Sequence, residues 1–162
     1  MGNNTYVGTG GSGAGFHGII HITEEGDYTI IVGSGATSVG GDRGYVGTGD
    51  TGETSYFKKG NNALIQCGGG TGGHCEPVSA YGGTGGTLII SNSVSKYALF
   101  VSSNGNSGNY YAGGSSCTVN PAKSVIPNHN FGASGKAHGN FDGGTSDPSI
   151  HGYFMITRKC AR

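Results

Sequence analysis

Short runs of alternating apolar and polar residues recur along the chain, and stretches dominated by glycine separate them. Residues 16–23 and 28–32 alternate with a period of two, which is typical of half-buried strands. The apolar side chains fall on one face of each run: Phe16, Ile20 and Ile22 in the first, and Tyr28, Ile30 and Val32 in the second. The polar turn Glu24-Glu25-Gly26-Asp27 lies between the two runs, so the pattern predicts a hairpin over residues 16–32.

Further short strands are expected along the rest of the chain. Residues 54–57 and 63–66 form one predicted pair, joined by the turn-like stretch 58–62. Residues 87–90 and 97–101 form another pair, and residues 152–158 a closing strand. No segment sustains an apolar period of 3.6 residues, so helix content should be small. We therefore expect a mainly β fold of short antiparallel strands, a sandwich-like hairpin scaffold.

Glycine, at 36 of 162 residues, is roughly three times as frequent as in an average protein. It fills the lead-in over residues 1–15 and long stretches over 33–52 and 68–86. Glycine loses more backbone entropy on folding than any other residue, so main-chain hydrogen bonding, cross-links or burial against other subunits must compensate. No three-residue glycine spacing persists, which excludes collagen and disfavours a regular ice-binding array. Short left-handed extended segments of the polyglycine type, packed side by side, agree with the pattern.

Length and charge narrow the class of protein. The chain has the length of one domain, residues 1–162, with a more variable region over residues 91–150 that is richer in Asn, Ser, His and Pro. Nine basic residues balance nine acidic ones without a basic patch, so no nucleic-acid partner is expected. No apolar run reaches the ~20 residues of a membrane span, and the N-terminus lacks the features of a signal peptide. These features fit a virion protein assembled in a host cytoplasm, or a secreted protein trimmed at its N-terminus.

Four cysteines, an even number in a domain with few large apolar residues, suggest disulfides. Cys67 and Cys75 bracket a glycine run, which makes a local clip attractive, and Cys117 with Cys160 would then tie a late loop to the last strand. Four cysteines allow three pairings, and the alternative is four buried free thiols in a reducing compartment.

Motifs that would carry chemistry are weak. Residues 8–13 match the dinucleotide pattern GxGxxG, but the preceding strand, the following helix and the acidic residue are missing. Cys67, His74 and Cys75 are soft metal ligands without a second pair to complete a zinc site. No serine stands in a strand-to-helix nucleophile elbow. We predict no catalytic residue, no metal and no cofactor.

Aromatic residues interrupt the polar and glycine-rich sequence at candidate loop tips. Such side chains either plug a small loop core or offer rigid contact area for a glycan or protein, because tyrosine has an apolar ring and a polar tip. The candidate partner-binding residues are Tyr45, Tyr81, Asn109, Tyr110 and Tyr111.

The order of these pieces carries a family resemblance. It consists of the glycine-rich entry, the 18–32 hairpin, the step Gly33-Ser34-Gly35-Ala36, the aromatic Ser55-Tyr56-Phe57, the 63–66 strand running into Gly68-Gly69-Gly70, and the closing strand. This order resembles the glycine-rich domain of bacteriophage tail fibres, other surface proteins and anaplastic lymphoma kinase-like receptor ectodomains. The resemblance is strongest over residues 8–90 and 151–158, and residues 91–150 depart from the pattern.

The resemblance implies strands that act as a scaffold, glycine segments packed as extended helices, and a structural, adhesive or ligand-recognition role. The expected function is therefore that of a non-enzymatic fibre or tail component on a virion or cell surface. Its expected partners are homo-oligomeric or other structural subunits and a surface glycan or protein receptor. The alternative is a purely structural filament subunit or capsid-associated cement protein with no receptor role. An ice-binding surface ranks third.

Overall fold

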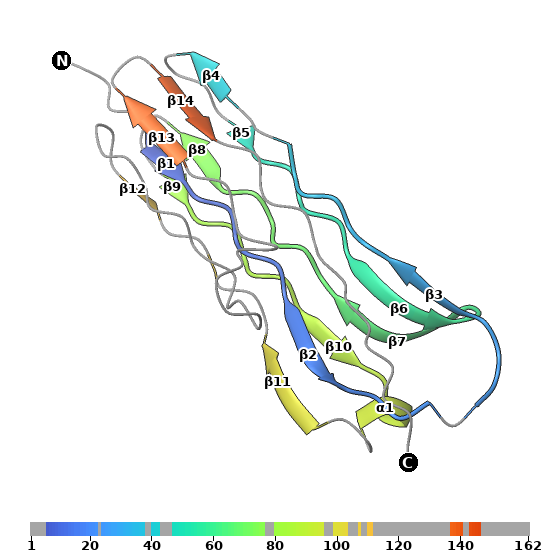
Figure 1. Cartoon of the computed structure of the whole chain (residues 1–162). Helices are drawn as coiled ribbons and strands as arrows, with labels where there is room; N and C mark the ends of the chain where they lie inside the picture. Colours follow the sequence, from blue (N-terminus) through green and yellow to red (C-terminus); the bar gives the residue numbers. More distant parts are fainter. Residues whose placement is uncertain are drawn as a thin grey trace.

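The computed structural model describes residues 6–22, 24–37, 40–42, 47–76, 80–95, 99–103, 107, 110–111, 137–140 and 143–146. Within them the protein is mainly β, every paired strand is antiparallel, and the one helix is the short α1 (Asn92–Ser95). This confirms the predicted fold class. Strands gather at two ends of an elongated molecule, and extended segments run between the ends (Figure 1).

Four sheets are formed by the described strands. One end holds β12 (Tyr110–Tyr111), β1 (Tyr6–Gly8), β8 (His74–Glu76) and β5 (Gly47–Thr48) in that order, with β9 (Ala80–Tyr81) also paired to β8. Near them lies the sheet β13 (Ala137–Asn140), β14 (Gly143–Ser146) and β4 (Gly40–Asp42) (Figure 1). The other end holds β10 (Leu88–Ile90), β7 (Asn62–Cys67), β6 (Ser55–Lys59) and β3 (Tyr28–Ile31), together with the pair β11 (Leu99–Ser103) and β2 (Gly15–Ile19).

The apolar core lies on one face of the four-stranded sheet. Phe57 and Ile65 stand directly opposite each other on β6 and β7 and are 1% and 4% exposed. Val94 of α1 completes the buried cluster, and Phe16 and Ile20 pack against it from the direction of β2. Burying side chains of this size contributes about 1.5–3 kcal/mol each. The two layers therefore give the predicted sandwich-like arrangement.

The hairpin predicted around residues 58–62 is confirmed. β6 and β7 pair from Lys59 opposite Asn62 to Ser55 opposite Cys67. Gly60 turns the chain with a φ of +54°, a conformation that glycine adopts without steric cost. The register shifts beside Phe57, because Lys58 pairs with Ala63 whereas Phe57 pairs with Ile65. This β-bulge bends the hairpin over the core.

The hairpin predicted over residues 16–32 is wrong. β2 pairs with β11, with Ile19 opposite Leu99, and β3 pairs with β6, with Ile30 opposite Phe57. A hairpin would have put both strands in one layer and left the face of Phe57 uncovered. Pairing each strand elsewhere lets Phe16 of β2 pack against that face.

Two other expectations need correction. β10 and β11 occur close to the predicted residues 87–90 and 97–101, but β10 pairs with β7 and β11 with β2. The glycine stretches, expected to be loops, contain the short strands β4, β5, β8 and β9. The predicted closing strand at residues 152–158 lies outside the described residues.

Four glycine-rich segments of six residues each connect the strands of the two ends: 9–14, 49–54, 68–73 and 82–87. We call these four segments the glycine bundle. Segment 68–73 hydrogen-bonds to the other three through main-chain groups. Along each pair of segments the bonds recur every third residue at 2.8–3.0 Å: Gly11 N–H to Thr71 O and Ala14 to Gly68, Gly49 to Gly73 and Gly52 to Gly70, Gly68 to Thr87 and Thr71 to Thr84, and Gly83 to Thr9 and Gly86 to Ser12.

A step of three residues is the repeat of the polyproline II helix, whose main-chain groups all point outward. At about 3.1 Å per residue, six residues span roughly 19 Å. Segment 68–73 runs antiparallel to its three neighbours, whereas segments 9–14 and 82–87 run in the same direction, since Thr9 and Ser12 pair with Gly83 and Gly86. The predicted polyglycine-type segments are therefore the rod that joins the two ends of the molecule.

The glycines of segment 68–73 are dictated by what each face of its threefold helix touches. A Cβ at Gly69 or Gly72 would lie 2.2 or 2.1 Å from a main-chain oxygen of segment 49–54. A Cβ at Gly70 would lie 2.1 Å from Gly11 O, in segment 9–14, and one at Gly73 would lie 2.0 Å from Gly8 O. Only the third face carries a side chain, that of Thr71, whose Oγ1 accepts the N–H of Thr84 at 2.7 Å. Two of every three positions must therefore be glycine.

Candidate functional site

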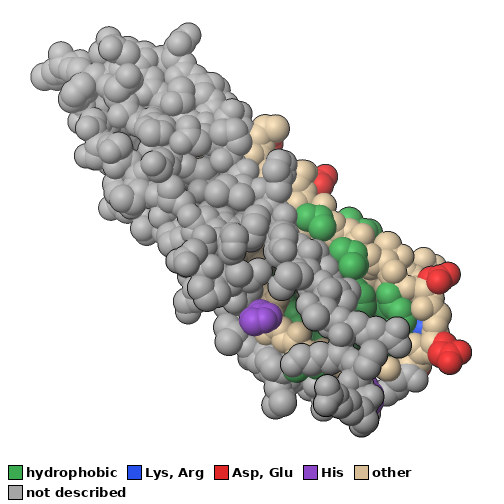
Figure 2. All heavy atoms as spheres, viewed as in Figure 1, with side chains coloured by type: hydrophobic (Ala, Val, Ile, Leu, Met, Phe, Trp, Pro, Cys, Tyr) green, Lys and Arg blue, Asp and Glu red, His purple; other side chains and the backbone are tan. Residues whose placement is uncertain are grey.

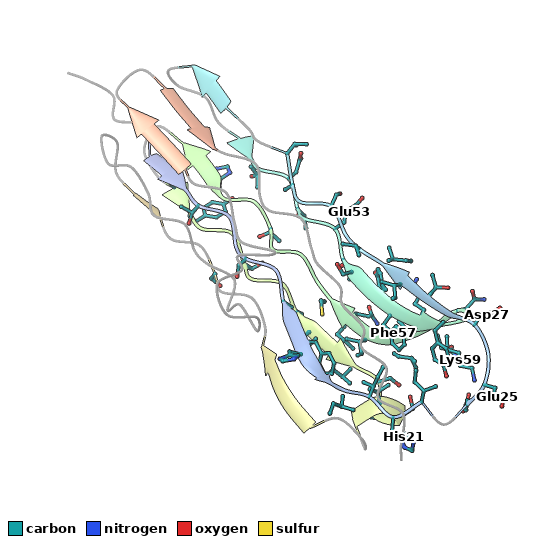
Figure 3. The ribbon with its side chains drawn as sticks, in the orientation of Figure 1. His21, Glu25, Asp27, Glu53, Phe57 and Lys59 are labelled. Atoms are coloured by element: carbon teal, nitrogen blue, oxygen red, sulfur yellow. The ribbon has the colours of Figure 1, made fainter. Side chains whose placement is uncertain are left out.

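Three of the predicted partner-binding residues meet in one sheet. Tyr110 and Tyr111 form β12, which pairs with β1 so that Tyr110 stands opposite Gly8. Tyr81 lies on β9, which contacts both β1 and β12. Tyr45 and Asn109 lie outside the described residues. We call Tyr81, Tyr110 and Tyr111 the tyrosine cluster; it lies at the end of the molecule opposite Phe57 (Figures 1 and 3).

The ring of Tyr81 packs against the imidazole ring of His74. The two residues stand directly opposite each other on β8 and β9, and their rings stack at a centroid distance of 4.5 Å with 12° between the planes. On the other side of His74, Thr48 of β5 is its cross-strand partner, and Thr48 Oγ1 lies 2.8 Å from His74 Nδ1. His74 is 8% exposed, whereas Tyr81 is 58% exposed.

This row of three residues fixes the position of Tyr81. The hydrogen bond to Thr48 holds the imidazole ring in one orientation, and the stacked imidazole supports one face of the phenol ring. Tyr81 thus offers apolar ring surface and a hydroxyl on a rigid base, which suits recognition of a glycan or a protein surface. Sequence reasoning treated His74 only as a weak metal ligand and missed Thr48, because the row exists only after three distant strands have paired.

Glycine allows the strands of this end to approach closely. A Cβ at Gly8 would lie 2.0 Å from Tyr81 O and 2.9 Å from His74 O. Thr9, which follows, is 2% exposed, and Ser12 is fully buried. The base of the tyrosine cluster is therefore continuous with the glycine bundle.

Two of the described acidic residues, Glu24 and Glu53, make contacts within the scaffold. Glu24 forms an ion pair with Lys59, and this hydrogen bond and charge lower the pKa of the Glu24 carboxyl. Hydrogen bonding from the Ser34 side chain, and from its N–H at 3.1 Å, lowers the pKa of the Glu53 carboxyl and ties residues 33–37 to segment 49–54. Both carboxylates are solvent-exposed, and Figure 3 shows Glu53 on the scaffold, away from the strands that carry the tyrosine cluster.

The predicted clip between Cys67 and Cys75 is not formed. Cys67 is a free thiol at the end of β7, and burial raises its pKa to about 11. Cys75 lies on β8 in a different sheet, at the far end of segment 68–73. Eight steps of about 3.1 Å place the two residues roughly 25 Å apart, whereas a disulfide needs Cα atoms within about 7 Å. Cys117 and Cys160 lie outside the described residues.

The same separation keeps Cys67 away from His74 and Cys75 as metal ligands. Among the residues that the structure describes, no three histidine, cysteine or acidic side chains come close enough to hold a metal ion. In the same part of the chain, no helix has the length and apolar character needed to cross a membrane.

Comparison with protein families, with curated proteins and with solved structures gave no match to the chain. The resemblance to glycine-rich surface domains stays a prediction.

Proposed function

We propose that the protein is a non-enzymatic structural and adhesive module of a virion or cell surface, and that its partners bind at the tyrosine cluster. The observation that carries the proposal is the glycine bundle. A rod about 19 Å long, bonded through main-chain groups, holds one group of strands at a distance from the other. A rigid spacer of this kind suits a protein that presents contact residues to a partner.

The tyrosine cluster supports recognition of a partner at one end of the rod. Tyr81 is the most exposed tyrosine or phenylalanine among the described side chains, and its stacking on His74 lowers the entropy cost of ordering it on contact. Phenol rings with a fixed orientation are common anchors for both glycans and proteins. The receptor class is therefore a surface glycan or protein.

The purely structural alternative, a filament subunit or cement protein, assigns the same residues to contacts between subunits. The two functions are separated by a double variant, Tyr110→Ala with Tyr111→Ala, compared with Tyr56→Ala at the other end of the molecule. In an adhesive protein the double variant assembles normally and no longer attaches to its target surface. In a cement protein the double variant fails to assemble, and neither the unsubstituted chain nor the variant attaches to a target surface.

Location is tested separately, by immunogold electron microscopy with antibodies against the chain. Labelling on the outside of the particle or cell that carries the protein supports the proposal. Recovery of the chain only as a soluble cytosolic monomer contradicts both functions.

A further inference from the structure

Segment 49–54 repeats the triplet Gly-acidic-Thr, so each face of its threefold helix carries one kind of residue. The glycine face bonds to the rest of the glycine bundle. The acidic face, Asp50 and Glu53, accepts hydrogen bonds from residues 33–37. The third face carries threonine, and Thr51 on it is exposed.

Two other segments of the bundle place threonine on the same side. The hydroxyls of Thr71 and Thr84 lie 3.2 Å apart, and a main-chain bond puts Thr87 level with Gly68. On the other side of Thr71, the bonds to the neighbouring segment put Thr51 level with it. Because one turn is three residues, side chains three apart share a face. We call the six threonines of this side the threonine face: Thr48, Thr51, Thr54, Thr71, Thr84 and Thr87.

His74 and Tyr81 complete the row at one end of the threonine face. Thr48 and Tyr81 are both cross-strand partners of His74, and this row lies one turn beyond the row of Thr71. One face of the Tyr81 ring stacks on His74, and the side chain is 58% exposed. The other face of the ring is therefore open at the end of the threonine face.

The threonine face is accessible and carries no charged side chain. Four of its threonines are exposed: Thr48, Thr51, Thr84 and Thr87. From the row of Tyr81 to that of Thr87 is two turns, or about 19 Å at about 3.1 Å per residue. Among the described residues, no hydrogen bond engages the hydroxyl of Thr51 or Thr87. These hydroxyls can therefore bond to a ligand that lies along the bundle.

We propose that the threonine face binds a neutral linear glycan, with one sugar ring stacked on Tyr81 and the following sugars hydrogen-bonded to the threonines. A sugar ring has an apolar C–H face and a rim of hydroxyls. A supported aromatic ring fits the C–H face, and threonine, both donor and acceptor, fits the hydroxyls. The inference rests on the proposed adhesive function, and it extends the contact from Tyr81 along the side of the rod.

The composition of the threonine face favours a glycan over a protein. The centre of a protein interface is apolar and enriched in aromatic residues, whereas this face has one aromatic ring, at its end. Exposed aliphatic side chains such as Ile30 and Ile31 lie at the other end of the molecule. Figure 2 shows green apolar side chains gathered over the strands of that end.

Charge favours a neutral glycan over an anionic one. Asp50 and Glu53 alternate with the threonines along segment 49–54, so their carboxylates border the threonine face. A row of carboxylates repels an anionic chain that lies beside it. Binding should therefore depend little on salt.

Binding of the full chain to an array of immobilised hexasaccharides tests the proposal. Neutral linear hexasaccharides of glucose, mannose, galactose and N-acetylglucosamine are compared with anionic fragments of hyaluronan and polysialic acid. We expect binding to a neutral glycan and to neither anionic one. Tyr81→Ala should weaken that binding on the order of tenfold. Tyr56→Ala, at the other end of the molecule, is the aromatic control and should bind normally.

The direction of the glycan is tested by NMR titration with the disaccharide and the hexasaccharide of the bound series. Thr87→Val removes a hydroxyl two turns from Tyr81. It should weaken binding of the hexasaccharide by about three- to tenfold and leave that of the disaccharide unchanged. Thr29→Val, at an exposed threonine of β3, is the matched control and should change neither.

Binding to no neutral glycan, binding to anionic glycans alone, or full binding by Tyr81→Ala overturns the proposal. Equal losses for the two lengths in Thr87→Val overturn the course along the threonine face. Attachment to a target surface whose glycans have been destroyed by periodate refutes the glycan and leaves the adhesive function standing. A chain that attaches to no surface, before or after periodate, refutes both. Far-UV circular dichroism and thermal melting confirm that each variant is folded.

Discussion

Replacing Gly72 by alanine tests how tightly the glycine bundle is packed. The added Cβ would lie 2.1 Å from Gly49 O, 2.2 Å from Gly49 C and 2.4 Å from Gly49 Cα, all of them main-chain atoms. Ordinary contact begins at 3.4 Å, so segments 49–54 and 68–73 must separate by about 1.3 Å (3.4 − 2.1) to admit the methyl group. No rotation of a side chain can relieve this contact.

Separation on this scale breaks the two bonds between the segments, from Gly49 to Gly73 and from Gly52 to Gly70, both 3.0 Å long. Losing two hydrogen bonds costs about 2 kcal/mol, and overpacking adds about 1–3 kcal/mol. We expect Gly72→Ala to lower the free energy of unfolding by about 3–5 kcal/mol. For a chain of this length that corresponds to a fall in Tm of roughly 10 °C.

Gly52→Ala is the matched control in the same pair of segments. Its Cβ would lie 3.5 Å from Gly69 Cα, an ordinary contact, and its φ is outside the left-handed region. We expect a change within about 1 kcal/mol, since alanine also reduces the entropy of the unfolded chain. Thermal and guanidinium unfolding, followed by far-UV circular dichroism and tyrosine fluorescence, measure both variants. Equal effects of the two substitutions would refute the packing argument.

Three further predictions concern single side chains. Cys67, with its pKa raised to about 11 by burial, should react with a thiol reagent at pH 8 on the order of 100 times more slowly than a free cysteine, in a variant whose other cysteines are serine. Because the thiol of the unfolded chain ionises at a lower pH, the free energy of unfolding should fall as pH rises from about 9 to 11. Cys67→Ala should flatten this dependence on pH. A reaction rate equal to that of a free cysteine, or the same pH dependence in Cys67→Ala, would count against burial of the thiol. Phe57→Ala should lose about 3–5 kcal/mol in guanidinium unfolding, and Ile89→Ala less than about 1 kcal/mol; comparable losses would place the core elsewhere. Glu24→Gln should leave the Tm at pH 7 unchanged, because its pair with Lys59 is exposed, and a fall as large as that of Phe57→Ala would contradict this.

Local signals in the sequence were enough to predict the hairpin of β6 and β7. Its turn contains Gly60, and the two short strands on either side pair directly across that turn. The same signals misassigned residues 16–32, where an equally plausible turn connects strands of two layers. What decides between the two outcomes is the need to cover the face of Phe57, and a short-range pattern does not contain that information.

The three-residue period of the bundle is present in the sequence but obscured. Each segment has only two turns, and the number of glycines per turn depends on how many neighbours the segment has. Segment 68–73 bonds to three other segments of the bundle and is glycine at five of its six positions, whereas segment 49–54 bonds to one of them and is glycine only at Gly49 and Gly52. A search for one repeat along the whole chain therefore finds none. The recurrence of six-residue glycine windows between apolar runs was the available signal.

The candidate site was predictable only in part. Tyr81 was selected as an exposed aromatic residue, and it is exposed. Its support by His74 and Thr48 depends on β5, β8 and β9 lying side by side, which brings together residues 26 and 7 positions from His74. Spacing along the chain gives no indication of such a row.

Native-state amide hydrogen exchange, measured residue by residue by NMR, tests the glycine bundle most directly. If main-chain bonds hold the segments together, the amides of Gly11, Gly49, Gly52, Gly68, Gly83 and Gly86 exchange slowly, at rates set by unfolding of the whole domain. Exchange of these six amides at the rate of an unstructured peptide, while the strands around Phe57 remain protected, would show that the glycine segments do not form the rod on which this account depends.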